Sequence, residues 1–363
     1  MRRGARTARG VAGHRVAGAM DGPSSRSEVD RGCLLADVLP LLTSVEGFTH
    51  IELLRTMSCC KALHQIRDMP LDLGRDMRGL SARNVLNFVG KHAGRFMLRD
   101  VHVNRCDQAG FEALLALPGL RSLCVRPPRE PDGLCIRSLA ALRTARSLAT
   151  LRLLQSTSLT LDGLDAVATC PSLSELSLTR TMLDAAELLS ARTRLRSLEL
   201  RRCNLNSSTT LDGLAEAGSA ATWSLEHLAL TAHGPPLDLA PLVALRILAT
   251  LDLSLCVGIV AAGALGRCAS LRVLTLTGCT ALADLGGLDE SATLETVYLT
   301  GCASLADASP LAACASLVHV HLNKCAKVRD VGAFGACERL RLLNIRCSGA
   351  VVVPQRSGLE VIF

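Results

Sequence analysis

Cysteine is the residue type in this chain that offers the most possibilities for chemistry, because sixteen of the 363 residues are cysteines. So many thiols could supply disulfides, a zinc site or reactive nucleophiles. No pair has the Cys-x-x-Cys spacing typical of zinc and redox sites. Ten of them instead recur at two fixed positions of a repeat, where free cysteine packs as a small apolar side chain. We therefore expect packing residues in a reducing compartment. The ten are Cys106, Cys203, Cys256, Cys279, Cys302 and Cys325 at the first position, and Cys170, Cys268, Cys314 and Cys337 at the second.

Histidine offers a second candidate for metal chemistry. His319 and His321 are two residues apart, so on a strand they share one face. The repeat supplies no third ligand, and we interpret both as solvent-exposed polar residues. The motifs G-x-S-x-G and H-E-x-x-H and a glycine-rich phosphate loop are also missing from the sequence. We predict no catalytic residue, no metal, no cofactor and no small-molecule substrate, and hence a protein that is not an enzyme.

The elements that carry the cysteines follow a repeated frame, L-x-x-L-x-L-x-x-C. From Leu225 onward its copies are separated by a constant step of 23 residues, and earlier copies by less regular steps. Eleven copies make the pattern too regular to be accidental. Their first leucines are Leu98, Leu120, Leu148, Leu173, Leu195, Leu225, Leu248, Leu271, Leu294, Leu317 and Leu340.

The spacing inside the frame predicts a short strand with one buried face. Leu251 and Leu253, for example, are two residues apart and point to the same side of a strand. The segments between strands are short and rich in Gly and Ala, which favours 3₁₀ or short helical turns. The pattern is typical of a leucine-rich-repeat solenoid. We predict an α/β horseshoe of about eleven repeats over residues 96–363, with a concave parallel sheet.

Composition agrees with a thin stacked core. Apolar residues make up 49% of the chain and aromatic residues only 2%, so the core must be built from small and medium aliphatic side chains. The sequence has no run of about 18 apolar residues, so we predict no membrane span. The formal charge of +7 does not require nucleic acid, and we expect none. These features indicate a cytoplasmic protein, with the nucleus left open.

Residues 1–30 form a basic segment that we interpret as a disordered tail. It begins MRRGARTARGVAGHRVAGAM, and its first acidic residue is Asp21. This charge pattern also fits a mitochondrial transit peptide, although hydroxyl residues are scarce and the glycines weaken a helix. A third interpretation is an upstream extension before a start at Met20 instead of Met1.

The positions that alternate with the strand leucines predict a partner-binding surface on the concave side. Arginines dominate in the early repeats, threonines and serines in the middle, and an aromatic and polar group near the end. Arg pairs with carboxylate or phosphate and Tyr anchors interfaces, so we expect a protein partner, with an acidic segment as one candidate. An alternative is that these positions are polar only for solubility. The candidates are Arg105, Arg126, Arg152, Arg180, Arg201, Arg202, Tyr298, His319, His321, Asn323 and Lys324, around the milder Thr250, Ser254, Thr275, Thr277, Thr296 and Thr300.

Residues 31–95 do not fit the repeat frame, and their apolar residues recur at helical spacing. We predict two or three short helices there, followed by another over ARNVLNFVGKHAG. The string VLPLL…IELLRTMSCCKALHQI resembles an F-box, a Leu-Pro start followed by a hydrophobic helix, a Leu-Leu-Arg stretch and a Cys-Lys pair. The stretch NVLNFVGKHAGRFMLRDVHVNRC resembles the junction at which F-box proteins enter cysteine-containing leucine-rich repeats. Departures from the family are the longer loop TSVEGFTH and Leu63, which stands where a tryptophan is common.

The resemblance implies a function. An F-box docks onto a Skp-type adaptor of a cullin ubiquitin ligase, so the repeats would recruit the substrate of an SCF-type ligase for ubiquitin-dependent degradation. The repeats also resemble those of parasite proteins linked to adenylate cyclase regulation. A second hypothesis is thus a scaffold or signalling regulator, in which residues 31–95 only cap the first repeat. The docking residues implied by the F-box resemblance are Leu39, Pro40, Leu41, Leu42, Ile51, Leu53 and Leu54.

Overall fold

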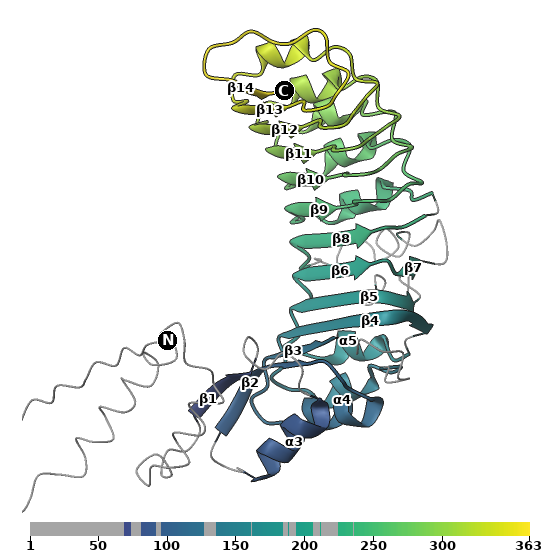
Figure 1. Cartoon of the computed structure of the whole chain (residues 1–363), viewed down its shortest axis with the longest axis vertical. Helices are drawn as coiled ribbons and strands as arrows, with labels where there is room; N and C mark the ends of the chain where they lie inside the picture. Colours follow the sequence, from purple (N-terminus) through teal and green to yellow (C-terminus); the bar gives the residue numbers. More distant parts are fainter. Residues whose placement is uncertain are drawn as a thin grey trace, which may run out of the picture. The chain divides into compact units, whose positions relative to one another are not determined.

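A computed structural model describes residues 69–73, 81–91, 96–126, 136–160, 162–183, 188, 194–205, 211, 224–234 and 236–363. All of them belong to one compact unit, Cys60–Phe363 (Figure 1). The predicted basic tail, the first predicted helices and the F-box-like docking residues lie outside the described residues. No helix within the described ranges is long and apolar enough to cross a membrane.

The unit is built on one parallel sheet. Thirteen strands follow one another in chain order, except that β7 leaves this path and pairs with β5. The strands are β1 (Met69–Leu73), β2 (Phe96–Val103), β3 (Ser122–Val125), β4 (Thr150–Thr160), β5 (Glu175–Leu183), β6 (Ser197–Arg201), β7 (Asn204–Leu205), β8 (His227–Thr231), β9 (Thr250–Asp252), β10 (Val273–Thr275), β11 (Thr296–Tyr298), β12 (His319–His321), β13 (Leu342–Asn344) and β14 (Glu360–Ile362). This arrangement is the leucine-rich-repeat solenoid that the sequence predicted.

The register of the sheet aligns the repeats at equivalent residues. Leu251 lies opposite Leu274, which lies opposite Val297, and Val297 lies opposite Val320. All four side chains are fully buried. Alternate strand residues therefore form one continuous column of aliphatic side chains, which is why the repeats depend on their neighbours for stability.

Short helices connect the strands and form a second layer that covers the buried face of the sheet (Figure 1). From η3 onward they are 3₁₀ turns, as predicted from the short Gly- and Ala-rich connections. Several begin beside an aspartate whose carboxylate accepts a hydrogen bond two residues on, such as Asp284 from Gly286 N (2.7 Å) and Asp307 from Ser309 N (2.8 Å). The helices are α3 (Ala82–Lys91), α4 (Gln108–Leu115), η2 (Ala140–Thr144), α5 (Asp165–Thr169), η3 (Ala240–Ala244), η4 (Gly263–Arg267), η5 (Leu288–Glu290), η6 (Ser309–Ala313) and η7 (Gly332–Ala336).

The repeated cysteines are packing residues, as the sequence predicted. All ten are buried free thiols. The Cys279 thiol donates to the carbonyl of Leu253 in the preceding repeat (3.2 Å), and Cys302 does the same to Leu276 (3.2 Å). Burial raises the pKa of Cys256 to about 11 and that of Cys279 to about 12. These thiols therefore stay protonated and serve as hydrogen-bond donors between layers.

The sheet begins earlier than the sequence analysis placed it. Residues 69–73, assigned above to the helical segment, form β1 and pair in parallel with β2. The sequence MPLDL alternates apolar residues at Met69, Leu71 and Leu73, a strand signal that the helical spacing around it obscured. The helix predicted over ARNVLNFVGKHAG is confirmed over Ala82–Lys91 as α3. At the other end, the sequence GLEVIF contributes β14, which pairs with β13 and extends the array by one strand.

Candidate protein-binding surface

The residues that alternate with the buried leucines form the concave face, on the inner side of the curved sheet (Figure 1). In the β9 repeat these residues are Thr250, Asp252 and Ser254, which alternate with Leu251 and Leu253. Because the strands are in register, equivalent positions of all repeats form continuous rows across the sheet. The concave face is thus a broad surface whose composition is set directly by the sequence.

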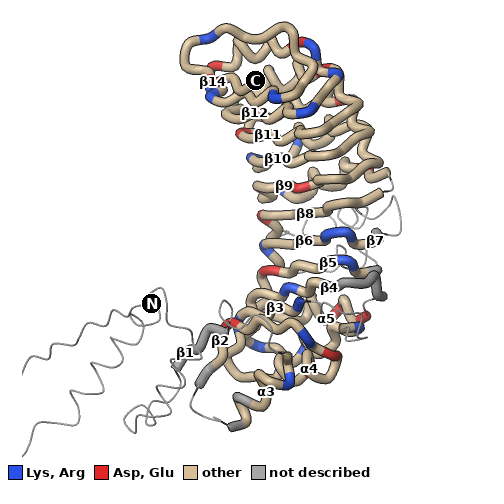
Figure 2. Tube along the Cα trace, viewed as in Figure 1, with Lys and Arg blue, Asp and Glu red and all other residues tan. Residues whose placement is uncertain are grey.

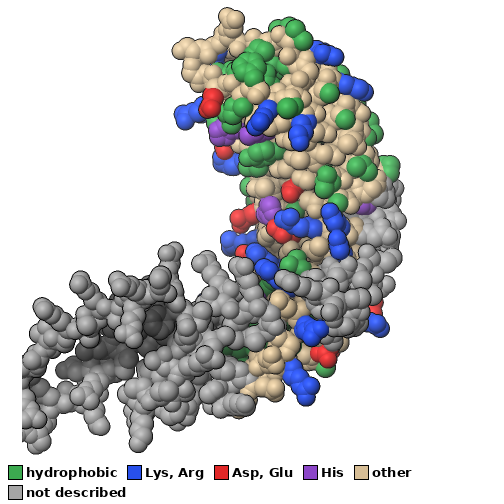
Figure 3. Space-filling view, in the orientation of Figure 1, with side chains coloured by type: hydrophobic (Ala, Val, Ile, Leu, Met, Phe, Trp, Pro, Cys, Tyr) green, Lys and Arg blue, Asp and Glu red, His purple; other side chains and the backbone are tan. Residues whose placement is uncertain are grey.

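A charged network occupies the concave face over β5, β6 and β8. Glu199 accepts a hydrogen bond from the Ser177 hydroxyl (3.0 Å) and lies 3.4 Å from Arg201 Nε and 3.7 Å from His227 Nε2. The His227 contact is the largest influence on the carboxyl, and with Ser177 and Arg201 it outweighs burial and lowers the pKa of Glu199 to about 2. Glu199 is thus an ionised hub that joins three strands. Figure 3 shows acidic, basic and histidine side chains gathered in this part of the solenoid.

The arginines predicted as a basic strip are partly neutralised. Arg152 lies 3.5 Å from Glu175 on the next strand, and Arg201 pairs with Glu199. The two glutamates occupy the same alternating positions as the arginines, so the repeat frame could have revealed them. Arg126, which follows β3, is exposed. This half of the concave face is therefore of mixed charge and does not by itself select an acidic partner.

Some predicted surface residues lie beside the concave face instead of on it. Arg180, Arg202 and Lys324 directly precede the first cysteine position and have φ angles of 56°, 53° and 59°. Equivalent residues of the later repeats, including Gly278 and Gly301, share this left-handed conformation. Arg105 has the same position in its own repeat. These four basic residues therefore lie at the carboxyl ends of the strands, where the chain turns away from the sheet.

An aromatic pair lies on the concave face of the C-terminal repeats. The ring of Tyr298 stacks on that of His321, with centroids 4.5 Å apart and planes inclined by 18°. His319, on the same strand as His321, lies 3.4 Å from the Thr296 hydroxyl through Nδ1. Burial, and then the neighbouring His319, lower the pKa of His321. His321 is therefore neutral at pH 7, and the pair presents an uncharged aromatic surface.

The surroundings of this pair are polar and small. Thr275, Thr277 and Thr300 lie on the concave face of β10 and β11 and their adjoining turns, as predicted. Asn323 follows β12, and its side-chain Oδ1 is buried without a hydrogen-bond partner. A buried amide oxygen without a partner costs about 1 to 3 kcal/mol.

Within the described ranges, no three His, Cys, Asp or Glu side chains lie together as possible ligands for an ion. His319 and His321 instead contact Thr296 and Tyr298, their neighbours on the adjacent strand.

Comparison with known proteins establishes the fold. No protein-family model and no curated protein sequence matches the chain. Among solved structures, an internalin (InlF) from Listeria monocytogenes covers 74% of this chain and 74% of its own, with 16% identity and a TM-score of 0.50. One chain of the yeast Rad7–Elc1 complex (14% identity, TM-score 0.40) matches over 93% of this chain and 98% of its own length. The leucine-rich-repeat domain of the type III effector XopL (16%, 0.39) covers 94% and 96%. The chain has the leucine-rich-repeat fold.

Proposed function

We propose that this solenoid binds another protein across the concave face of its C-terminal repeats, with the stacked Tyr298 and His321 at the centre of the contact. The observation that carries the proposal is this aromatic pair on an otherwise small and polar surface. Tyrosine is enriched among residues that dominate binding energy, because it offers apolar area and a hydroxyl together.

The charged residues on the concave face of β4, β5, β6 and β8 serve specificity in this proposal. Its ion pairs hold Arg152, Glu175, Glu199 and Arg201 in a fixed pattern of alternating sign. A partner with complementary charges gains orientation there, whereas the neutral C-terminal half supplies most of the affinity.

Photo-crosslinking tests this proposal. A benzophenone amino acid replaces Thr277 or Thr300, beside the aromatic pair, and in a control it replaces Ala264 in the helical layer. We expect the Thr277 and Thr300 forms to capture the same protein, and the double change Tyr298→Ala and His321→Ala to reduce its capture at least about tenfold. Equal capture by the Ala264 form, or capture unaffected by the double change, would show that the partner binds elsewhere.

The finer proposal is that the bound protein is the substrate of an SCF-type cullin ubiquitin ligase. Its support is the F-box resemblance of residues 39–54, in which Leu39, Pro40, Leu41, Leu42, Ile51, Leu53 and Leu54 would contact a Skp-type adaptor. The alternative is a non-catalytic scaffold or signalling regulator, such as a regulator of adenylate cyclase, whose N-terminal helices act as a cap.

Co-purification separates the two. As a substrate receptor, the tagged chain brings down a Skp-type adaptor and a cullin, and Pro40→Asp with Leu53→Asp abolishes this association. Tyr298→Ala, a matched change in the repeats, leaves the adaptor bound. If no adaptor is recovered, or if the Pro40 and Leu53 changes have no effect, the ligase proposal fails and the scaffold alternative stands.

A further inference from the structure

Three exposed apolar side chains project from one turn, directly after β9. Leu255, Val257 and Val260 are 49%, 46% and 58% exposed. Two residues between them, Cys256 and Ile259, are buried and fix the turn to the core. Single exposed apolar residues are common on protein surfaces, whereas three so close together form a local apolar patch. We call residues 255–260 the apolar turn.

The backbone aligns this turn with the equivalent turns of the following repeats. Leu255 N donates to the carbonyl of the residue that precedes Gly278, at 2.7 Å. Gly278 N and Gly301 N make the same bond to the next repeat, both at 2.8 Å. Lys324 is therefore three repeats beyond Leu255 in one continuous row. Adjacent parallel strands lie about 4.8 Å apart, so the two residues are about 14 Å apart along the solenoid.

The turn that contains Lys324 is cationic. Lys324, Lys327 and Arg329 are all exposed. Arg329 takes the position of Val260, as Lys324 takes that of Leu255, because each is three 23-residue repeats further along the chain. None of the three cations has an ion pair with another residue of the described ranges. Figure 2 shows Lys and Arg positions gathered near the C-terminal turns. We call residues 324–329 the cationic turn.

The two repeats between these turns carry only small, uncharged side chains on the same surface. The equivalent residues, 278–283 and 301–306, include no charged residue. Leu255 leans toward them, because a Cβ added at Gly278 would lie 2.6 Å from Leu255 Cδ2. No exposed large side chain of these segments therefore separates the apolar turn from the cationic turn. The side chains outside the core in this neutral floor are Thr280, Ala281, Ala283, Ala303, Ser304 and Ala306.

We propose that this surface docks a peptide segment of a partner protein, with aliphatic side chains on the apolar turn and carboxylates on the cationic turn about 14 Å away. Half-exposed aliphatic side chains gain from burial against apolar groups, and cations without an ion pair gain from carboxylates. The neutral floor leaves room for the intervening residues and adds no charge of its own. The surface lies at the carboxyl ends of the strands, apart from the Tyr298–His321 pair, so this proposal does not rest on the proposed function.

Charge argues against two other occupants. In a symmetric pair of copies centred on Leu255, the cationic turn of one copy would face the repeats of the other that carry Arg180 and Arg202, so like charges would meet. A flat anionic membrane would also meet the exposed Asp284 and Asp307, which directly follow the neutral floor. A narrow peptide segment can cross the neutral floor without covering these carboxylates.

Two peptides of the same composition test the spacing on the full chain by fluorescence polarisation. One is fluorescein-labelled Leu-Leu-Gly-Ser-Gly-Ser-Asp-Asp-Glu, whose Gly-Ser-Gly-Ser linker can span about 14 Å, since an extended residue covers about 3.3 Å. The other is Gly-Ser-Gly-Ser-Leu-Leu-Asp-Asp-Glu, in which the leucines adjoin the acidic residues. We expect the first to bind at least about threefold more tightly. Equal affinities, or no binding of either peptide, would contradict the proposal.

Matched variants locate the apolar end of the contact. Leu255→Asn with Val257→Ser should weaken binding of the first peptide at least about tenfold. Asparagine is used at position 255 because it tolerates the φ angle of 63° there. The control Ile247→Ser changes a residue before β9 that is as exposed as Val257, at 46%, and alters the affinity less than about twofold.

Charge reversal locates the cationic end. Lys324→Glu with Arg329→Glu should weaken binding of the same peptide at least about tenfold. The control Arg246→Glu, at an exposed arginine before β9, alters it less than about twofold. Tyr298→Ala with His321→Ala leaves the peptide affinity unchanged, which separates failure of this proposal from failure of the proposed concave-face function.

Sedimentation with vesicles of equal parts phosphatidylserine and phosphatidylcholine tests the lipid alternative, and analytical ultracentrifugation tests the second copy. We expect the chain to stay in the supernatant and to sediment with the mass of one chain. Co-sedimentation with vesicles, or a dimer, that Leu255→Asn with Val257→Ser abolishes would assign the surface to that occupant and overturn the proposal. Peptide binding that Ile247→Ser or Arg246→Glu weakens as much as the turn variants do would also overturn it.

Discussion

The phenol ring of Tyr298 stacks on the imidazole of His321, with 4.5 Å between the ring centroids. The two residues are directly opposite each other in the register of β11 and β12. Adjacent parallel strands hold opposite side chains close together, so the repeat spacing of 23 residues itself creates the pair. The contact is therefore also part of the packing between adjacent repeats.

The Tyr298–His321 contact should be measurable as a coupling energy. We expect a double-mutant cycle with Tyr298→Ala and His321→Ala to give about 0.5 to 1.5 kcal/mol in urea unfolding at pH 7.5, where His321 is neutral. A parallel cycle with Tyr298→Ala and Thr277→Ala, which removes no ring contact, serves as control and gives a value near zero. Additive effects in the first cycle would mean that the stacking contributes nothing to stability.

Glu199 should stabilise the solenoid in a pH-dependent way. The pKa of its carboxyl is about 2, against an ordinary value of 4.5, so its contribution is complete above pH 4.5 and is lost as the pH falls toward 2. We expect Glu199→Gln to cost about 1 kcal/mol at pH 7, because Arg201 and His227 lose an ionised partner. Urea unfolding at pH 7 and pH 2.5 measures this difference, which shrinks at the lower pH.

A matched change on a more exposed ion pair controls for general charge effects. Glu226 pairs with Arg196, and both side chains are more than half exposed. Glu226→Gln should have a smaller effect at both pH values, because solvent screens the pair. A Glu199→Gln effect that is the same at pH 7 and pH 2.5 would contradict the proposed ionic role.

The buried cysteines should resist alkylation in the folded chain. Among the twelve described cysteines, Cys347 is exposed and the other eleven are buried. We expect native iodoacetamide treatment at pH 8, followed by peptide mass spectrometry, to label Cys347 and to leave Cys256 and Cys279 unmodified. Burial raises the pKa of both of these thiols, to about 11 and about 12. Labelling in denaturant shows that every site can react. Rapid native labelling of Cys279 would contradict its packing role.

Much of this arrangement follows from the sequence because its interactions are periodic. A frame that repeats the same leucines and cysteines determines strand positions, buried faces and parallel order, and within the repeats of that frame these were predicted correctly. Ion pairs such as Arg152–Glu175 were not predicted, although both residues lie on the concave face of adjacent strands, in diagonal positions. β1 was missed because a five-residue alternation carries little signal beside helical spacing.

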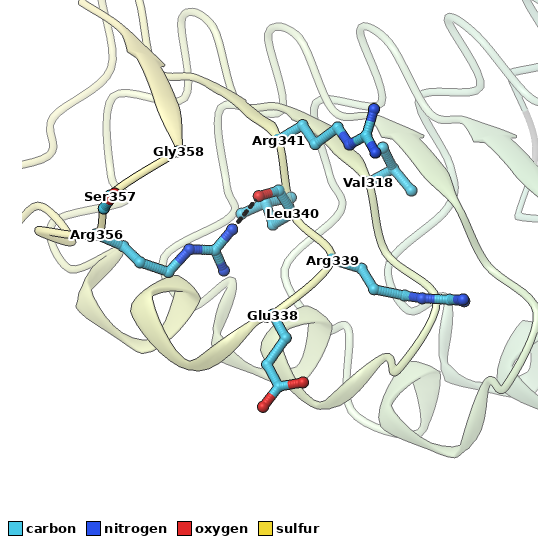
Figure 4. A pocket seen from close by; sticks show the side chains of 8 residues that line it. All are labelled: Val318, Glu338, Arg339, Leu340, Arg341, Arg356, Ser357 and Gly358. Atoms are coloured by element: carbon cyan, nitrogen blue, oxygen red, sulfur yellow. Dashed lines mark hydrogen bonds between the residues drawn. The ribbon is translucent and has the colours of Figure 1, made fainter.

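Other features could not have been predicted from the spacing. The left-handed conformation before the first cysteine position occurs with Arg, Ala, Leu, Lys and Cys as well as Gly, so residue type does not reveal it. Arg356 lies in the turn before β14 and donates to the carbonyls of Cys337 and Leu340 in the chain that precedes β13; Figure 4 shows the bond to Leu340. Such a contact lies outside the repeat, and no periodic pattern specifies it.

The left-handed position should respond to glycine in opposite directions at different repeats. Gly301 has a φ angle of 77°, and Gly301→Ala should cost about 1 to 2 kcal/mol because an L-residue is strained there. At Gly278, an added Cβ would also lie 2.6 Å from Leu255 Cδ2, so Gly278→Ala should cost more unless Leu255 moves.

Lys324, at φ 59°, already bears this strain. Lys324→Gly removes about 1 to 2 kcal/mol of it and adds about 0.5 to 1 kcal/mol of unfolded-state entropy, so we expect a net gain of about 0.5 kcal/mol. Thermal and urea unfolding of the three variants measure the order. Destabilisation by Lys324→Gly would show that its side chain makes contacts worth more than the strain.

His233 should make the solenoid lose stability in mild acid. It occupies the first cysteine position of its repeat, its side chain is buried, and its Nε2 has no hydrogen-bond partner. Burial lowers its pKa below the ordinary value of 6.5. Below pH 6.5, His233 therefore binds a proton more readily in the unfolded chain than in the folded chain. Its contribution is complete above pH 6.5 and is lost as the pH falls below that value, with a limiting slope of about 1.4 kcal/mol per pH unit.

The substitution His233→Cys isolates this effect, because cysteine is the residue of six other repeats at the same position. We expect urea unfolding at pH 7.5, 6.5 and 5.5 to show a smaller acid-dependent loss in the variant than in the wild type. His227→Gln, at a partly exposed histidine on the preceding strand, is the control and retains most of the loss. Equal pH dependence in the wild type and His233→Cys would mean that His233 accommodates its proton within the fold. The first cysteine position of this repeat would then tolerate the positive charge of a protonated histidine.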